Sequence, residues 1–272
     1  MPMVHISGSS LYYLDRGQGI PIILLHGFLG NAFMWAPQIT YFEDQFRLIA
    51  PDIWGHGNSG NLPDRTSNLT EVAQHLLSLL DILEVKNFIL VGHSVGGMLA
   101  GEIAVKAPDR VIALALIDTH LGQEPAQSRE FFLNLISILE SHEHFPLTLI
   151  EELQRLFFAS NDSDTISRLK TSFHNYLSKL EKDRITISIV PLGRMIFNRR
   201  DMTTEFSLID AASTLVVCGQ YDIVRPPTEA QAMAARIGCN YVEVPYAAHI
   251  PNIENTYFVT KTLRNFIYSI IK

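Results

Sequence analysis

The chain has 272 residues, of which 47% are hydrophobic and 18% are charged, and its formal net charge is −7 at pH 7. This size and apolar content allow one domain with a large core, with or without an insertion. The acidic charge argues against nucleic acid and membrane surfaces as partners, and the absence of a leader-like or membrane-spanning apolar run predicts a cytoplasmic protein.

The first part of the chain predicts strands that end in polar or glycine-rich loops. Strands are expected at residues 2–7, 10–15, 20–25 and 48–50, and a helix is expected near residues 35–45. A glycine-rich loop at 26–30 follows the third of these strands, and a polar loop at 52–59 follows the fourth. We expect Asp52 to hold the second loop together, and His26 and His56 to support the two loops.

A serine lies between two glycines after the next strand. Residues 69–84 predict a helix, residues 87–91 a short buried strand, and residues 95–107 a second helix. Ser94 therefore lies on a sharp strand-to-helix turn, and the sequence G-H-S-V-G at 92–96 matches the nucleophile elbow G-x-S-x-G. Glycine on both sides removes side chains that would collide with the strand and the helix. Ser94 is the candidate nucleophile, and the alternative is a serine that only caps the helix.

A helical insertion then interrupts the alternation of strands and helices. After an apolar strand at 111–117, apolar residues recur at helical spacing from about 121 to 205. Arg194, Arg199 and Arg200 lie near the end of this segment. They either bind a substrate carboxylate or remain solvated surface charges.

The last part of the chain returns to strands and helices. Strands are expected at 215–218 and 241–244, and helices at 226–237 and 254–271. Cys218 and Cys239 lie in or beside these segments without zinc-like spacing. They predict reduced, buried thiols, and the sequence indicates no metal site.

Two aspartates and one histidine follow the later strands directly. Asp118 comes after the sixth strand, Asp222 after the seventh, and His249 after the last. A serine nucleophile needs a neighbouring base to accept its proton, and His249 fits this role. Asp222 is favoured as the acid that orients the histidine, because its loop ends in a proline at a helix start. Asp118 stays open as the alternative acid.

The order Ser94, Asp222, His249, with each residue just beyond the carboxyl end of a predicted strand, resembles the serine-hydrolase branch of the α/β-hydrolase superfamily. The resemblance covers nearly the whole chain. It implies an α/β fold in which a mostly parallel eight-stranded sheet is flanked by helices, with a helical cap inserted after the sixth strand. The implied units are a core of residues 1–120 and 206–272 and a cap of residues 121–205.

The same resemblance implies a mechanism that needs no cofactor and no metal. Ser94 attacks a carbonyl carbon, His249 moves the proton, and Asp222 fixes the orientation of the imidazole. The backbone N–H groups of Phe28 and Val95 would form the oxyanion hole. The side chains expected to line the substrate pocket are Trp35, Met98, Phe131 and Phe158. A role in the core is an equal alternative for each of them.

The expected substrate is a small or medium carboxylic ester, cleaved through an acyl-enzyme. A lactone is an alternative, because residues 230–234 resemble 3-oxoadipate enol-lactonases. Carbon–carbon bond hydrolases of the meta-cleavage type usually carry Gly-Pro-Gly in the first glycine loop and an aromatic residue after the catalytic histidine. This chain has Phe-Leu-Gly at 28–30 and Ile250 there. A hydrolase-like binding protein is a third alternative, and the sequence does not indicate the oligomeric state.

Overall fold

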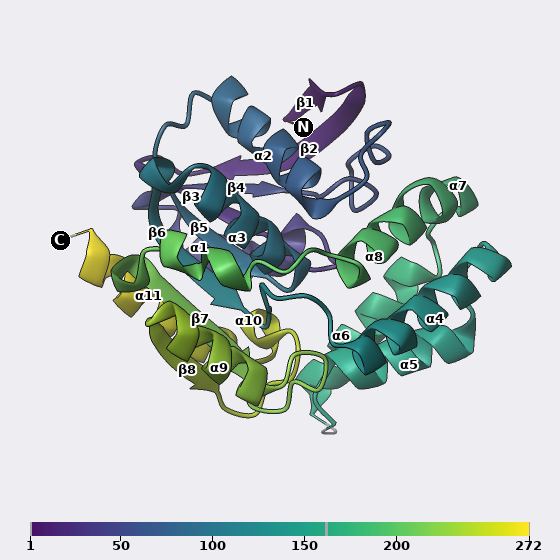
Figure 1. The fold of residues 1–272 in the computed structure, drawn as a ribbon. Helices are drawn as coiled ribbons and strands as arrows, with labels where there is room; N and C mark the ends of the chain where they lie inside the picture. Colours follow the sequence, from purple (N-terminus) through teal and green to yellow (C-terminus); the bar gives the residue numbers. More distant parts are fainter. Residues whose placement is uncertain (1, 161–162, 272) are drawn as a thin grey trace.

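The computed structural model describes residues 2–160 and 163–271. Within these residues the chain forms a sheet of eight strands in the order β1-β2-β4-β3-β5-β6-β7-β8 (Figure 1). The strands are β1 (Met3–Ile6), β2 (Ser9–Arg16), β3 (Ile20–Leu25), β4 (Phe46–Pro51), β5 (Phe88–His93), β6 (Val111–Ile117), β7 (Thr214–Gly219) and β8 (Asn240–Val244). Strand β2 pairs antiparallel with β1 and β4, and the other pairs are parallel. The predicted α/β fold is confirmed.

The central strands are apolar on both faces because helices cover both sides of the sheet. Every residue of β5 and of β7 is buried, as is usual for parallel strands in a doubly covered sheet. Successive side chains of a strand point to opposite faces. In β3, Ile23 and Leu25 belong to a first core, and Ile22 and Leu24 belong to a second core.

Different helices cover the two cores. The first core lies against α2 (Leu69–Ile82), α3 (Val95–Lys106) and α9 (Pro227–Ile237), and the second lies against α1 (Ala36–Phe42) and α11 (Thr256–Ile270). The shorter helices are η1 (Ala32–Trp35), η2 (Pro108–Arg110), η4 (Thr203–Leu208), η5 (Ala211–Ser213) and α10 (Pro251–Glu254). Each helix in the described part of the chain is too short or too polar to span a bilayer.

Among the described residues, six further helices lie between β6 and β7 and inside the range predicted for the insertion. They are α4 (Ala126–His142), α5 (Leu147–Phe157), α6 (Asp164–Leu177), α7 (Lys182–Arg184), the π-helical turn η3 (Ile185–Ile189) and α8 (Val190–Phe197). We call residues 126–197 the helical segment. It gathers on one side of the molecule (Figure 1). Phe132, Leu153 and Ile196 of this segment belong to the first core, which also contains the buried side of α3.

The register of the parallel strands brings their carboxyl ends to one edge of the sheet. The residue pairs at this edge are Leu25 with Gly92, Gly92 with Leu116, Ile117 with Val217, and Gly219 with Val244. The loops that follow β3, β5, β6, β7 and β8 therefore begin next to one another. In open parallel sheets, ligands bind at this edge.

Candidate active site

Ser94 lies at the turn between β5 and α3 in a strained backbone conformation. Its φ is 53° and its ψ is −119°, a combination that residues with a side chain rarely adopt. A Cβ atom at Gly92 would lie 2.3 Å from the carbonyl oxygen of Gly96, and a Cβ atom at Gly96 would lie 2.3 Å from that of Leu25. This close approach requires glycine on both sides of Ser94. Within the described residues, the Ser94 hydroxyl makes no capping bond to α3, so the helix-cap interpretation is not supported.

The structure brings Ser94, His249 and Asp222 together in one chain of hydrogen bonds. His249 Nε2 lies 3.1 Å from Ser94 Oγ, and His249 Nδ1 lies 2.8 Å from Asp222 Oδ2. The second oxygen of Asp222, Oδ1, accepts the N–H groups of Val224 at 2.8 Å and Arg225 at 3.0 Å. Of the two aspartates that the sequence left open, Asp222 is the one bonded to His249.

The carboxyl group of Asp222 is ionised although it is buried. Burial opposes ionisation, but the neighbouring imidazole of His249 and the hydrogen bonds to the carboxylate outweigh it, so the pKa of Asp222 is lowered. Helix α5 holds His249 in place. The ring of Phe157 lies 5.4 Å from the His249 ring, and the Phe157 carbonyl oxygen accepts the His249 N–H at 3.2 Å.

Three buried histidines support the loops around Ser94 in their neutral form. Burial lowers the pKa of His26 to about 4, and that of His56 and His93 to about 3. Neutral imidazole nitrogens accept hydrogen bonds. His26 accepts a backbone N–H of the loop after β4 at 2.8 Å, and His56 accepts the N–H of Leu29 at 3.0 Å. His93 Nε2 lies 2.5 Å from the carbonyl oxygen of His249.

The loop after β3 passes directly over Ser94. A Cβ atom at Gly27 would lie 3.2 Å from the Cβ of Ser94. Asp52 ties this region to the loop after β4, because its carboxylate accepts the N–H groups of Ala32 at 2.7 Å and Asn58 at 2.8 Å. The two loops predicted from the sequence therefore hold each other in position.

The two residues predicted to form the oxyanion hole adjoin Ser94 from different sides. Val95 is the first residue of α3, and N–H groups in the first turn of a helix have no acceptor within that helix. Phe28 belongs to the loop that passes over Ser94, and its side chain lines a cavity together with Ser94. Phe28 thus borders the cavity in front of Ser94, and Val95 follows Ser94 directly in the chain.

Two cavities lie beside Ser94. The inner cavity, of about 50 Å³, is lined by Ser94, His249 and mostly apolar side chains, Met98 and Phe132 among them. The outer cavity, of about 250 Å³, is lined by Phe158, by residues of α6 and by the loop after β3. The side chains that line both cavities are Phe28 and Phe157.

Two of the four side chains predicted to line the pocket do so, and two do not. Met98 lines the inner cavity and Phe158 the outer one. Trp35 is fully buried in the second core instead, because η1, which ends at Trp35, packs against β3 and β4 on that face of the sheet. Phe131 is 38% exposed on α4, and the next residue, Phe132, lines the inner cavity in its place.

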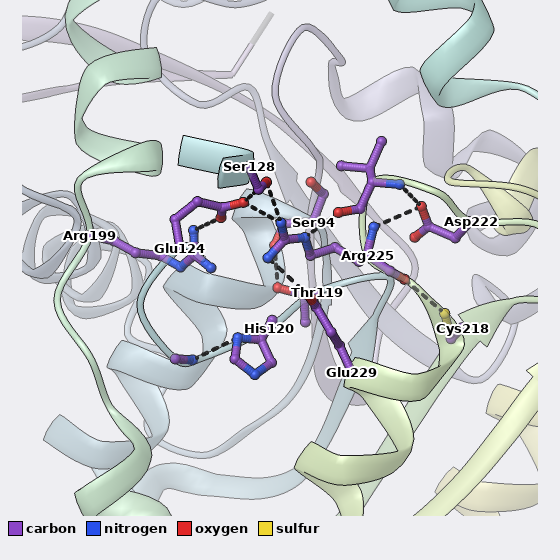
Figure 2. Close-up of polar contacts among 12 residues, drawn as sticks. Ser94, Thr119, His120, Glu124, Ser128, Arg199, Cys218, Asp222, Arg225 and Glu229 are labelled. Carbon is purple, nitrogen blue, oxygen red and sulfur yellow. Dashed lines mark hydrogen bonds and ion pairs between the residues drawn. The ribbon is translucent and has the colours of Figure 1, made fainter. Parts of the chain in front are cut away.

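A buried cluster of charged side chains lies beside the inner cavity (Figure 2), and its members Glu124 and Arg225 line that cavity. Glu124, between β6 and α4, accepts hydrogen bonds from the guanidinium groups of Arg225 and Arg199. The side chains are 1%, 3% and 4% exposed. Although burial opposes ionisation of Glu124, the two guanidinium groups outweigh it and lower the pKa of this carboxyl group.

Arg225 connects the acid of the site with the helical segment. Its backbone N–H binds Asp222, and its guanidinium group lies 3.3 Å from Ser128 Oγ on α4 (Figure 2). It also lies 3.4 Å from Glu229 on α9. Glu124 and Arg225 were not among the residues predicted from the sequence. The one available signal was the position of Arg225 three residues after Asp222.

The three arginines singled out in the sequence are paired with glutamates of the same chain. Each therefore has an anionic partner without a substrate carboxylate, and Arg199 is not a surface charge. The pairs are Arg194 with Glu140 at 2.5 Å, Arg199 with Glu124 at 2.5 Å and Arg200 with Glu102 at 2.7 Å.

The side chains of Asp118, Cys218 and Asp222 lie as close to one another as the ligands of a metal ion would. One side-chain atom of each lies within 4.8 Å of the others. The Cys218 thiol donates to backbone carbonyl oxygens at 3.3 and 3.5 Å, and burial raises its pKa, so it keeps its proton. Asp222 already binds His249. A protonated thiol and a histidine-bound carboxylate do not fit a cation site.

Residues 20–256 match the family model of the alpha/beta hydrolase fold. The chain therefore belongs to the α/β-hydrolase fold family, as the sequence predicted. The structure is similar to that of a thermophilic esterase from Thermogutta terrifontis with bound malate, at 26% identity and a TM-score of 0.86 over 100% of both chains. It shares its fold with the enol-lactonase from Burkholderia xenovorans LB400, at 23% identity and a TM-score of 0.85, over 98% of this chain and 100% of that one.

Curated relatives include putative carbamate hydrolases called RutD. The one from Klebsiella pneumoniae (strain 342) is 29% identical over 241 residues, which are 86% of each chain. The one from Azorhizobium caulinodans is 36% identical over 118 residues, 43% of this chain and 44% of that relative. The second alignment thus spans less than half of either protein. The names of these relatives support hydrolase activity.

Proposed function

We propose that the protein is a serine hydrolase that cleaves small to medium carboxylic esters through an acyl-enzyme. The observation that carries this proposal is the hydrogen-bond chain from Ser94 through His249 to Asp222 at the wall of a small, mostly apolar cavity. A serine hydroxyl is a weak nucleophile until a neighbouring base accepts its proton. The chain of hydrogen bonds supplies that base and the carboxylate that orients it.

In the proposed mechanism, His249 Nε2 accepts the Ser94 proton as Oγ attacks the carbonyl carbon of the ester. Asp222 holds His249 Nδ1–H and stabilises the imidazolium that forms. The carbonyl oxygen becomes negative and accepts hydrogen bonds from the N–H groups of Phe28 and Val95. His249 then gives the proton to the departing alcohol. Water, deprotonated by His249, cleaves the acyl-enzyme and restores Ser94.

The cavities limit the substrates that fit this mechanism. The inner cavity of about 50 Å³ accepts the acyl group, and the outer cavity of about 250 Å³ accepts the alcohol. This space suits a small molecule rather than a macromolecule. Lactones and carbamates also present an electrophilic carbonyl carbon. One structural neighbour is named an enol-lactonase and one relative a putative carbamate hydrolase. A panel of esters, lactones and carbamates separates these classes by kcat/KM.

The Ser94→Ala variant tests the nucleophile. We expect it to lose nearly all turnover of p-nitrophenyl butyrate and all labelling by a fluorophosphonate probe, while its thermal midpoint stays near that of the wild type. The matched control is Ser137→Ala, which removes an exposed hydroxyl on α4 and should label and turn over normally. Turnover of Ser94→Ala near the wild-type rate would remove Ser94 from the mechanism, and a wild-type protein that neither labels nor turns over would be a binding protein.

A further inference from the structure

Asp118 lies beside the proposed catalytic acid without taking part in the chain of hydrogen bonds to Ser94. It follows β6 directly, its φ is 45°, and its side chain is fully buried. Its backbone N–H donates to the carbonyl oxygen of Val217 at 2.9 Å. The carboxyl ends of β6 and β7 are neighbours in the sheet, so the side chains of Asp118 and Asp222 meet there.

The hydrogen bonds of the two carboxyl groups leave one oxygen without a donor. Asp118 Oδ1 accepts the N–H of Gly219 at 2.8 Å. Asp222 Oδ1 accepts two backbone N–H groups, and Asp222 Oδ2 binds His249. In the part of the chain that the structure describes, no N–H or O–H group donates to Asp118 Oδ2. The Cys218 thiol, a weak donor, and the carboxylate of Asp222 both lie within hydrogen-bonding reach of the Asp118 carboxyl group.

The side chains of Asp118 and Asp222 have oxygen atoms within 4.8 Å of each other. Two buried carboxylates this close cannot both be ionised without a cation between them. The titratable groups that face Asp118 are Asp222 and the neutral Cys218 thiol, and neither is a cation. Burial raises the pKa of Asp118 well above its usual value, and the negative charge of Asp222 raises it further. Asp222 keeps its charge because it faces His249. The proton of the pair therefore resides on Asp118.

We infer that Asp118 is a positioning residue that stays protonated and donates a hydrogen bond from Oδ2 to the carboxylate of Asp222. This bond fixes the plane of the Asp222 carboxylate opposite His249. It also withdraws part of the negative charge that would otherwise face the imidazole. The catalytic consequence rests on the proposed serine-hydrolase function, whereas the protonation of Asp118 does not.

Two substitutions at this position separate a protonated Asp118 from an ionised one. Asn has the shape of protonated Asp: its oxygen accepts the Gly219 N–H and its amide group donates to Asp222. We expect Asp118→Asn to keep kcat within about threefold of the wild type and to leave the acid limb of kcat/KM in place. Asp118→Ala removes the donor, and we expect kcat to fall about tenfold or more, with little change in KM, because the Asp222 carboxylate is no longer held. In the Asp118→Ala variant, the acid limb of kcat/KM should move about half a pH unit to higher pH, because the Asp222 carboxylate then keeps its full negative charge.

An ionised Asp118 would give a different pattern. Both variants would then remove a negative charge near His249, and both would move the acid limb to lower pH. That result would overturn the inference. Asp222→Asn is the reference for loss of the acid itself, with an expected drop of about 10⁴ in kcat.

Infrared spectroscopy tests the proton without any turnover. The difference spectrum of wild type minus Asp118→Asn at neutral pH should contain the carbonyl band of a buried carboxylic acid. A difference spectrum that contains carboxylate bands instead would overturn the inference, whether or not the protein is a hydrolase. If the acid band appears and Ser94→Ala still turns over substrate, the proposed function fails while the protonation of Asp118 stands.

Discussion

The carboxyl groups around Ser94 differ in charge because their neighbours differ. Asp222 faces an imidazole and Glu124 faces two guanidinium groups, and the pKa of both carboxyl groups is lowered although burial opposes ionisation. For Asp118, burial and the charge of Asp222 act in the same direction and raise the pKa. At the scale of single residues, the partners decide which carboxyl group carries a proton, because burial is common to all three.

The raised pKa of Asp118 predicts a dependence of stability on pH. A carboxyl group whose pKa is raised on folding makes its full contribution to the free energy of unfolding below its pKa in the unfolded chain, near 3.9. This contribution is lost as pH rises from that value towards the pKa in the folded protein, at about 1.4 kcal/mol per pH unit. Asp118→Asn needs no proton, so its free energy of unfolding relative to the wild type should increase from about pH 5 to about pH 8. Urea unfolding at both pH values measures this, with the exposed Asp64→Asn as control. A difference that does not change with pH would contradict the protonation of Asp118.

At the scale of elements, the buried charges join three connections of the fold. Glu124 lies before the first helix of the helical segment, Arg199 lies after the last one, and Arg225 lies in the loop that carries Asp222. Both ends of the helical segment are therefore connected through Arg225 to the loop of Asp222, the proposed catalytic acid. Removing one member of a buried ion pair leaves its partner charged without compensation.

Glu124→Gln should destabilise the fold much more than a comparable change on the surface. The substitution leaves the buried guanidinium group of Arg199 without a carboxylate and leaves Arg225 with only the more distant Glu229. We expect a loss of about 3–5 kcal/mol in the free energy of unfolding. The matched control is Glu140→Gln, because Glu140 pairs with Arg194 at side-chain exposures of 51% and 43%. Its expected loss is about 1 kcal/mol or less. Equal losses in urea unfolding would mean that the cluster does not hold the segment to the sheet.

The sequence predicted the strands, most helices and the order of Ser94, Asp222 and His249, because apolar runs, helical spacing and strand-end loops are local signals. It did not predict the cluster, because Glu124 bonds residues 75 and 101 positions away and no local pattern marks such pairs. It also chose Phe131 over Phe132. Helical spacing does not decide which of two adjacent phenylalanines faces a cavity until the packing of α4 is known.

The helical segment covers the carboxyl ends of the strands, where Ser94 and His249 lie. Its apolar residues share the first core with α3, and Phe157 contacts the ring and the backbone of His249. The segment therefore forms part of the site rather than a separate unit beside it. The shape of the inner cavity depends on how α4 and α5 pack over Ser94.

The small inner cavity predicts a limit on acyl length. Each methylene that fits adds about 0.8 kcal/mol until the space is filled. A cavity of about 50 Å³ has room for only a short chain, so we expect the highest kcat/KM among esters of about two to four acyl carbons. Phe132→Ala removes a lining side chain and should move the optimum to longer chains. A kcat/KM series that includes an emulsified triglyceride checks this. Rates that keep rising to long chains, or activation at the lipid interface, would mean that the helical segment is a mobile lid.

The strained backbone conformation of Ser94 lowers the thermal stability of the protein, although the proposed reaction needs a serine at this position. Leu29, Ser94 and Asp118, which follow β3, β5 and β6, all have positive φ values, 61°, 53° and 45°. Such conformations cost on the order of 1–3 kcal/mol each, and glycine would relieve them. Selection of variants for heat resistance alone would therefore favour glycine at 94 and discard the nucleophile. An engineering campaign on this protein must screen for turnover at every round, because three of its residues with positive φ lie around the reacting group.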